Sequence, residues 1–437
     1  MNKIALDLNQ IIQESNPYIF EMLSNVGREL FFPKGILSQS AEAKEKAHKI
    51  NATIGIAKEN NSVMGLDSIT DSVRGIDPEE YLPYASSYGL PALREKWKRE
   101  LFRKNSSLNG KNISLPIVTC GITHAVSIFA DVWTNPGDTV ILPDMMWGNY
   151  NMTFGVRNGV KVVQYDTFDS ELTAYNLDAF EKMVKKEAQS SEKIILLLNF
   201  PHNPTGYSLS LEEGKKIAQI LEDIAKEGTN VIAVCDDAYF GLFYEEETMK
   251  ESLFSLLAGC DERLLAVKLD GATKEDYAWG LRLGFITYGL SAEKNIEELY
   301  NALEKKTAGC VRGNVSNISH LSQTILLKSM ESNDYSEQKQ GKYDLLMKRC
   351  SAIKEIVKDP SYKTAFDVYP FNSGYFMCIR LKENNAEKLR IHLLDKYGLG
   401  LISIGENNLR VAFSCVEENE LKTLFDLILK GVENLRL

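Results

Sequence analysis

The sequence predicts an α/β protein with two domains. The large domain has a mostly parallel seven-stranded sheet covered by helices, and the smaller α+β domain is built from the N- and C-terminal parts. Between about residues 90 and 330, runs that are apolar on both faces alternate with helical patterns, which is typical of a parallel sheet buried between helices. After Pro360 the pattern changes to that of a compact α+β unit. The 437 residues are enough for both domains.

Apolar runs predict the seven strands of the large domain. They cover residues 115–119, 139–142, 160–163, 193–199, 230–235, 264–269 and 284–287. Helices are predicted between several of them, for example at 121–133 and 211–226. In sheets of this kind, ligands bind beyond the carboxyl ends of the strands. Residues just after these strands are therefore the first candidates for a functional site.

The smaller domain is predicted from both ends of the chain. Residues 318–358 read as helical, with a break near 332–334. Strands are expected at 375–381, 399–404 and 409–413, and helices at 386–396 and 417–434. The first sixty residues or so predict helices and one short strand at 52–56, and we expect them to pack with the C-terminal unit. The predicted limits are 1–64 and 326–437 for the small domain and 65–325 for the large, ligand-binding domain.

Composition narrows the class of protein. The net charge of −10 argues against a nucleic-acid or anionic-membrane partner. No secretion signal or membrane span is recognisable at the start of the chain or elsewhere. The seven cysteines are scattered and never form CxxC, which suits reduced thiols in a cytoplasm. The five histidines show no metal-ligand spacing, so no metal site is expected, and no nucleotide-binding glycine motif is present.

Polar residues that could take part in catalysis or binding follow four of the predicted strands. They are Asn203 in the Pro- and Gly-rich loop 199–206, Asp236 and Tyr239 after strand 230–235, Lys274 and Arg282 after strand 264–269, and the strand-to-helix turn Cys120-Gly-Ile-Thr-His-Ala125. Each alone has an ordinary explanation as a turn, a helix cap or a solvated loop. The turn at 120–125 also offers backbone N–H groups that suit a phosphate.

Taken together, these motifs resemble the pyridoxal-phosphate-dependent class I/II aminotransferases of the aspartate aminotransferase fold type, fold type I. The resemblance extends from about residue 50 to the C-terminus. Its pieces are Asn203-Pro-Thr-Gly206, Asp236-x-Ala-Tyr239, Lys274 with Arg282 and Gly284, and Arg410 within Asn408-Leu-Arg-Val. Trp147-Gly148-Asn149 and the segment from Arg312 to Ser316-Asn317 resemble the aspartate and aromatic branch of that family.

The resemblance implies pyridoxal 5′-phosphate as cofactor and gives each residue a role. Lys274 would form the Schiff base and move the substrate proton, and Asp236 would face the pyridine nitrogen. Tyr239 and Asn203 would form hydrogen bonds to the phenolic oxygen, and Trp147 would stack on the ring. Cationic Arg282 would grip the phosphate and help to keep Lys274 neutral. The remaining phosphate contacts would be Gly121, Ile122, Thr123, Thr273 and, from a neighbouring subunit, Tyr84, with Tyr81 as the alternative.

The resemblance also implies a substrate class and a homodimer with shared active sites. Arg410 and Gly55 would bind the α-carboxylate beside Asn203 and Trp147, and Arg312 of a neighbouring subunit would bind a distal carboxylate. This favours aspartate or glutamate with 2-oxoglutarate or oxaloacetate. Alternatives are an aromatic aminotransferase, a β-eliminating lyase on the same fold, or a non-catalytic cofactor-binding effector module. Two departures from the family pattern are Gly271, where a hydroxyl residue is usual, and Val315, where an aromatic is usual.

Overall fold

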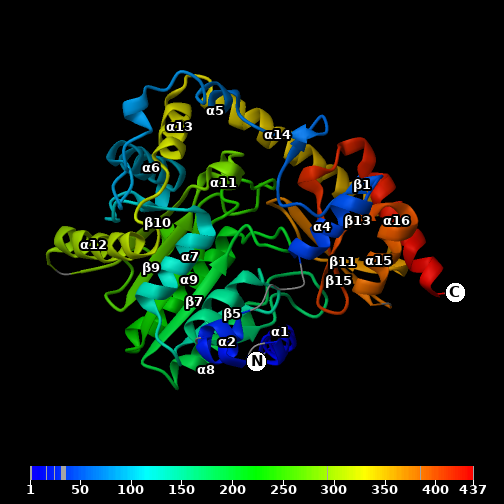
Figure 1. The fold of residues 1–437 in the computed structure, drawn as a ribbon, viewed down its shortest axis with the longest axis horizontal. Coiled ribbons are helices and arrows are strands. Elements are labelled where there is room, and N and C mark those ends of the chain that lie inside the picture. Colours follow the sequence, from blue (N-terminus) through cyan, green and yellow to red (C-terminus); the bar gives the residue numbers. More distant parts are fainter. Residues whose placement is uncertain are drawn as a thin grey trace.

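The computed structural model describes residues 2–15, 17–23, 25–30, 36–292, 294–383 and 385–436 (Figure 1). A large α/β unit occupies one side of the molecule, and a smaller unit drawn in orange and red lies on the other. The long helix α14 (Tyr335–Ile356) runs from the first unit to the second. The predicted fold class is confirmed, whereas the domain limits at 64/65 and 325/326 stay predictions.

The large unit is organised around one seven-stranded sheet. Its strands are β4 (Ile117–Thr119), β5 (Thr139–Pro143), β6 (Lys161–Tyr165), β7 (Lys193–Asn199), β8 (Asn230–Asp236), β9 (Leu264–Asp270) and β10 (Gly284–Gly289). The order across the sheet is β4-β10-β9-β8-β7-β5-β6, and only β10 runs antiparallel to its neighbours. The seven predicted strands are therefore confirmed. Because β7, β8 and β9 are parallel, their carboxyl ends lie together at one edge.

Helices pack in and around the large unit, and those that lie on the sheet bury an apolar stripe against it. They are α6 (Pro91–Lys104), α7 (Gly121–Trp133), α8 (Leu177–Ala188), α9 (Leu211–Lys226), α10 (Leu253–Leu257), α11 (Ala272–Glu275), α12 (Ile296–Asn314) and α13 (His320–Glu331). Helix α9 buries Ile217, Leu221 and Ile224 at helical spacing, and Ser210 with Glu213 forms a capping box at its start. The helices predicted at 121–133 and 211–226 are confirmed.

The smaller unit has its own core and its own antiparallel sheet, in the order β11-β12-β15-β14. Its strands are β11 (Phe366–Val368), β12 (Phe376–Leu381), β14 (Ile402–Ile404) and β15 (Asn408–Ala412), with helices α15 (Ala386–Tyr397) and α16 (Leu421–Arg436). The pair β1 (Ile50–Asn51) and β13 (Leu399–Gly400) joins the N-terminal segment to this unit. The segments before it are α1 (Lys3–Ser15), α2 (Pro17–Met22), α3 (Asn25–Glu29) and α4 (Ile36–Lys46), and those after it are β2 (Lys58–Glu59), β3 (Ser62–Val63) and α5 (Asp67–Asp71).

Two strand predictions for the small unit were wrong in detail. No strand forms at 52–56, and the nearest strand is β1 at residues 50–51. The chain turns away after β1, where Thr53 donates from its N–H and its hydroxyl to Asn51 Oδ1, at 3.2 and 2.6 Å. The strand expected at 399–404 is divided, because β13 pairs with β1 whereas β14 pairs with β15. Among the described residues, no helix is long and apolar enough to cross a membrane.

The two units meet where the loop 199–206 packs against residues 372–376. The carbonyl of Gly206 accepts hydrogen bonds from the N–H groups of Asn372 and Ser373, both at 2.9 Å. Gly206 has a φ of +76°, and a Cβ built on it would stand 1.9 Å from the carbonyl oxygen of Phe376. Only glycine allows this approach. The last residue of the Asn203–Gly206 motif thus holds the two units together.

We expect the substitution Gly206→Ala to destabilise the protein by about 3 kcal/mol or more, because it adds a backbone clash to an unfavourable φ. Gly228→Ala is the matched control, since Gly228 also has a positive φ, +107°, but nothing lies within 4 Å of its added Cβ. That control should lose only about 1–2 kcal/mol. Urea unfolding of both variants measures the difference, and equal losses would contradict the proposed contact.

Candidate active site

One pocket of about 170 Å³ lies at the carboxyl ends of β7, β8 and β9. The predicted residues Gly55, Ile122, Trp147, Asn203, Asp236, Tyr239, Lys274 and Arg410 line it, together with Tyr150, Asn199, Ala238 and Phe376. These residues come from both units, because Gly55, Phe376 and Arg410 belong to the segments that pack with the small sheet. The structure therefore brings together residues that are more than 350 positions apart in the chain.

Lys274 lies in the single helical turn α11, three residues after Gly271, the glycine that follows β9. Its ammonium nitrogen lies 5.0 Å from the centre of the Tyr239 ring, and the described residues form no ion pair with it. The pKa of Lys274 is lowered to about 8, chiefly by burial; Asp236 opposes this shift and the positive charge of Arg282 contributes to it. A substantial fraction of the amine is therefore neutral, and nucleophilic, near neutral pH.

Asp236 is the last residue of β8, and its carboxylate faces the pocket. It accepts hydrogen bonds from the Tyr150 hydroxyl at 2.6 Å and from the N–H of Ala238 at 3.0 Å. Burial raises the pKa of Asp236 to about 6 despite these two donors. A cation placed against this carboxylate would favour its charged form. The site is therefore suited to a ligand that carries positive charge at this point.

The adjacent Asp237 points elsewhere and is not part of the pocket. It forms a buried ion pair with Lys268 on β9 and accepts a hydrogen bond from Ser252 at 2.5 Å. Lys268 also lies 3.6 Å from Asp270. Because side chains alternate at the end of β8, Asp236 lines the pocket and Asp237 does not.

Arg410, on β15, connects the small unit to the loop of Asn203. Its guanidinium donates to Asn203 Oδ1 at 3.2 Å and to the carbonyl of Thr53 at 3.1 Å, and it lies 4.1 Å from the centre of the Phe376 ring. Arg410 is 2% exposed, and its Nε has no partner among the described residues. A buried guanidinium without an anionic partner is well suited to bind a carboxylate.

Arg282 and the N-terminus of α7 form a cationic corner beside the pocket. A Cβ added to Gly121 would stand 2.6 Å from Nη2 of Arg282, so the guanidinium lies directly on the first turn of α7. The hydroxyl of Thr273 is buried and has no partner among the described residues. Free helix N–H groups, a guanidinium and a hydroxyl are the donors that a phosphate prefers. Thr123, also predicted here, is exposed on the same helix turn.

Close packing explains the unusual Gly271. Its backbone is extended, but a Cβ at this position would stand 2.5 Å from the carbonyl oxygen of Leu283 and 2.9 Å from Cα of Gly284. A serine or threonine would require the strand β10 to move away from β9. The missing hydroxyl is therefore a consequence of the close approach of these two strands.

Two predicted residues do not reach the pocket of their own chain. Tyr84 is 91% exposed, and Arg312, at the end of α12, is exposed and donates to the hydroxyl of Ser316 at 2.6 Å. They nevertheless belong to one region of the surface. Ser87 donates to the carbonyl of Ser316 at 2.7 Å, which ties the loop of Tyr84 to the segment of Arg312.

Besides Ala238, which lies within the predicted Asp236–Tyr239 motif, three residues of the pocket were not predicted. Tyr150 follows the Trp147-Gly148-Asn149 segment, and that spacing is the only signal in the sequence. Asn199 ends β7, donates to the carbonyl of Asp236 at 2.8 Å and accepts from the N–H of Asn203 at 2.8 Å, so it connects two strand ends. The third residue, Phe376, comes from the small unit, and its role depends on how the two units pack.

Comparison with known proteins agrees with this geometry. Residues 56–428 match the family model described as "Aminotransferase class I and II". The chain belongs to the class I and II aminotransferases. Members of this family use pyridoxal phosphate, and the enzyme is accordingly a pyridoxal-phosphate-dependent aminotransferase.

Relatives of this aminotransferase extend over most of its length. The aspartate aminotransferase of Pyrococcus horikoshii is 24% identical over 409 residues, which cover 91% of this chain and 96% of the relative. That of Sulfurisphaera tokodaii is 25% identical over 353 residues, 78% and 80% of the two chains. Among solved structures, an aminotransferase from Anaerococcus prevotii has a TM-score of 0.82 at 22% identity, covering 94% of this chain and 99% of the other. A kynurenine aminotransferase of Pyrococcus horikoshii has a TM-score of 0.78 at 16% identity, covering 95% and 98%.

The contact from Tyr150 to Asp236 gives a prediction for the cofactor-free aminotransferase. The substitution Tyr150→Phe removes a donor to the charged carboxylate, so it should raise the pKa of Asp236 above its present value of about 6. A carboxyl with a raised pKa stabilises the fold below about pH 4, and this contribution is lost as the pH rises through the pKa of the folded state. In the variant, this loss of stability should therefore extend to higher pH than in the parent protein.

The measurement is the free energy of unfolding of the cofactor-free protein between pH 4 and 8. Tyr165→Phe is the control, because its buried hydroxyl bonds Tyr175 at 2.8 Å and does not contact Asp236. Both variants should lose about 1–2 kcal/mol of stability, but only Tyr150→Phe should change the pH profile. Identical profiles would show that Tyr150 does not influence the protonation of Asp236.

Proposed function

We propose that this enzyme binds pyridoxal 5′-phosphate on Lys274 and transfers amino groups between aspartate or glutamate and a 2-oxo acid, as a cytoplasmic homodimer with shared active sites. The observation that carries the proposal is the meeting of three side chains in one pocket. A partly neutral amine on Lys274, a buried carboxylate on Asp236 and a buried guanidinium on Arg410 lie around the same space. The seven cysteines are free thiols, in keeping with a reducing cytoplasm.

The residues present fit the cofactor. Its phosphate would lie at the corner of Arg282, Thr273 and the start of α7, whose donors are otherwise unused or exposed. Asp236 would face the ring nitrogen, and Asn203 and Tyr239 would face the phenolic oxygen. When bound, pyridoxal phosphate supplies an aldehyde for the amine and a ring that accepts electrons from the substrate Cα.

The chain itself supplies binding, orientation and proton transfer. Arg410 binds the substrate α-carboxylate as a fork, with the Gly55 N–H beside it. This would orient the Cα–H bond toward Lys274, whose Nζ would take the proton from Cα and hold it for delivery to the bound cofactor. Asp236 keeps its charge because Tyr150 and the Ala238 N–H donate to it, so it can hold a proton on a facing ring nitrogen. The rings of Trp147 and Phe376 enclose the site and exclude water.

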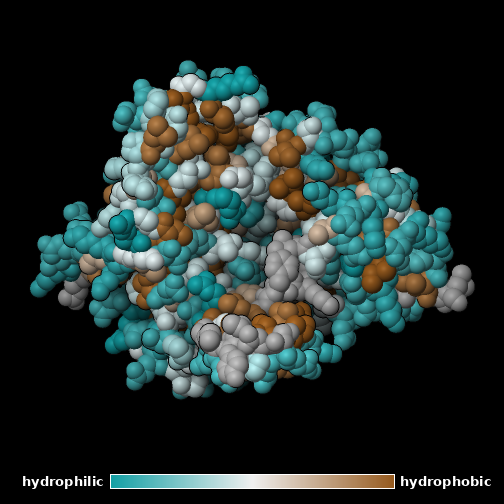
Figure 2. Space-filling view, viewed as in Figure 1, coloured by the Kyte–Doolittle hydropathy of each residue, from teal (hydrophilic) through white to brown (hydrophobic). Residues whose placement is uncertain are grey.

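Contacts between surface segments support a shared active site. The loop that carries Tyr84 is tied to α13 by a contact of 2.9 Å between His320 Nδ1 and the Pro83 carbonyl. Exposed apolar side chains lie on the same segments, namely Leu82, Val315 and Leu321. Figure 2 shows apolar side chains gathered over the part of this face where α5 and α13 lie. An apolar surface of this kind suits a second copy of the chain, to whose pocket Tyr84 and Arg312 would contribute.

Three measurements on Lys274 test the proposed chemistry. Attachment of pyridoxal phosphate to the cofactor-free protein should accelerate as the pH rises and level off above about pH 8, because the neutral amine is the reactive form. Borohydride reduction followed by peptide mapping should locate the cofactor on Lys274. Lys274→Ala should lose turnover by at least about a thousandfold. Substantial transamination by this variant, or attachment at another lysine, would contradict the assignment.

The substrate class is tested separately by Arg312→Ala. The variant is assayed with aspartate or glutamate and with an aromatic donor, each with 2-oxoglutarate. Loss of a cationic partner for the distal carboxylate should cost about 3 kcal/mol, roughly two decades in kcat/KM, for the dicarboxylic donors alone. Arg99→Ala, an exposed arginine on α6, is the control and should leave both activities unchanged. An equal fall for both donors would make Arg312 structural and favour the aromatic alternative.

A further inference from the structure

A tyrosine of the small unit reaches the turn that carries Lys274. Tyr375 directly precedes β12 and is fully buried, and its hydroxyl donates a hydrogen bond to the backbone carbonyl of Lys274 at 3.0 Å. The two residues are 101 positions apart in the chain. The next residue, Phe376, lines the catalytic pocket, and its ring centre lies 4.1 Å from the guanidinium of Arg410. Two consecutive residues of the small unit thus contact the proposed base and the proposed carboxylate clamp.

The turn that Tyr375 contacts is short. Helix α11 has only four residues, and the last carbonyls of any helix have no partner within the helix itself. The Lys274 carbonyl accepts from the N–H of Tyr277 at 3.3 Å, which is longer than the usual distance of about 2.9–3.0 Å. Tyr277 has a positive φ of 54°, so the helical course ends there. The Tyr375 hydroxyl is therefore an important partner of this carbonyl.

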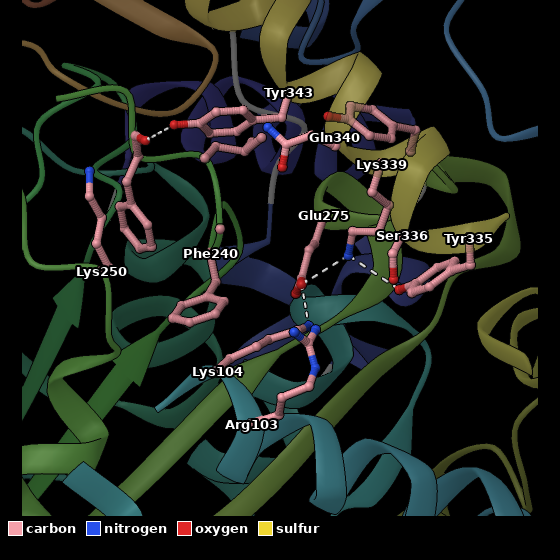
Figure 3. A pocket seen from close by; sticks show the side chains of 14 residues that line it. Arg103, Lys104, Phe240, Lys250, Glu275, Tyr335, Ser336, Lys339, Gln340 and Tyr343 are labelled. Atoms are coloured by element: carbon pink, nitrogen blue, oxygen red, sulfur yellow. Dashed lines mark hydrogen bonds and ion pairs between the residues drawn. The ribbon is translucent and has the colours of Figure 1, made fainter. Parts of the chain in front are cut away.

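Open space lies on both sides of the same turn. Lys274 lines the catalytic pocket, whereas the next residue, Glu275, lines a separate cavity of about 570 Å³ (Figure 3). Figure 3 shows the carboxylate of Glu275 between Lys104 and Lys339, with which it forms ion pairs. These ion pairs fix the turn from the side of the larger cavity. The contact from Tyr375 acts on the backbone of Lys274 itself.

The surroundings of Tyr375 hold its hydroxyl in place. Its ring meets the Tyr239 ring edge to face, with ring centres 5.4 Å apart, and lies 6.3 Å from the Trp279 ring. The carbonyl of the preceding residue, Gly374, accepts a hydrogen bond from the Tyr244 hydroxyl at 2.7 Å. Burial raises the pKa of Tyr375 well above its ordinary value, so the hydroxyl stays protonated and remains a donor throughout the neutral range.

We propose that Tyr375 is a positioning residue for Lys274. By fixing the carbonyl, its hydroxyl sets the rotation of the peptide that follows the Lys274 Cα, and so the direction in which the side chain enters the pocket. The small unit then holds both the amine and the guanidinium of Arg410, which sets the distance between the base and a bound carboxylate. This inference rests on the proposed function, in which Nζ takes the proton from the substrate Cα. A displacement of about 1 Å can slow such a step about a hundredfold.

The first test does not require turnover. Pyridoxal phosphate is added to cofactor-free Tyr375→Phe, which keeps the ring contacts and loses only the hydroxyl. Attachment to Lys274 should be about tenfold slower than in the parent at every pH, because the amine is less often in the reactive orientation. The midpoint of the pH dependence should stay at about 8, since no charge around Nζ changes.

The second test follows the half-reaction of the holoenzyme with glutamate in single turnover. Tyr375→Phe should lower the maximal rate by about ten- to a hundredfold. The dissociation constant of glutamate should stay within about twofold of the parent value, because Arg410 is unchanged. The slowed reaction should show a large primary isotope effect with α-deuterated glutamate, which assigns the loss to proton transfer.

Tyr244→Phe is the matched control. It removes a hydrogen bond to the same segment of the small unit, but this bond goes to the carbonyl of Gly374 and not to the lysine turn. The control should lower the midpoint of urea unfolding as much as Tyr375→Phe does. It should match the parent in the attachment rate, the maximal rate and the isotope effect.

Contrary results separate this inference from the proposed function. Attachment and proton transfer at parental rates in Tyr375→Phe would overturn the positioning role, and a slowed half-reaction without an isotope effect would do the same. Equal losses in Tyr244→Phe would also overturn it, because they would come from a loosened segment. If the parent attaches the cofactor but does not react with glutamate, the proposed substrate fails. Slower attachment in Tyr375→Phe alone would then still support the positioning role.

Discussion

The active site depends on a carboxylate and an amine that are buried in one pocket without a direct ion pair. Asp236 ends β8, and Lys274 follows the end of the adjacent parallel strand β9 by four residues, so both lie at the same edge of the sheet. Burial favours the neutral form of both groups. It raises the pKa of Asp236 to about 6 and lowers the pKa of Lys274 to about 8. Such an arrangement costs stability, because neither charge is fully compensated. The proposed cofactor, a charged ligand with a reactive carbonyl, would complete both groups.

The second requirement is that the pocket be closed by a different unit of the fold. Arg410 reaches the pocket from β15, and Gly206 allows the backbone of residues 372–376 to approach the loop that carries Asn203. Arg410 and Asn203, which we propose to bind the substrate carboxylate and the cofactor ring, are therefore placed by a single interface. A change in that interface would alter substrate binding and cofactor contacts together.

The short segments after β8 and β9 each separate two cavities. One residue of each lines the pocket of Lys274, and the next lines a separate cavity of about 570 Å³ that is also lined by α6 and α14. The ion pairs of Glu275 with α6 and α14 also fix the position of α11, since Glu275 directly follows Lys274. The helix that joins the two units is thereby linked by charge to the turn that carries the catalytic lysine.

The sequence by itself determined the strands of the large sheet, the helices at 121–133 and 211–226, and eight of the residues that line the pocket. These features depend on hydrophobic periodicity and on short motifs, which are local in the chain. Packing alone decided the rest. Residues 52–56 are not a strand because Asn51 and Arg410 take up the hydrogen-bonding groups of Thr53. Tyr150 and Asn199 join the site because three strand ends meet there, and Gly271 is required by the approach of β10. Contacts between segments distant in sequence leave no periodic signal, so only the tertiary structure could specify them.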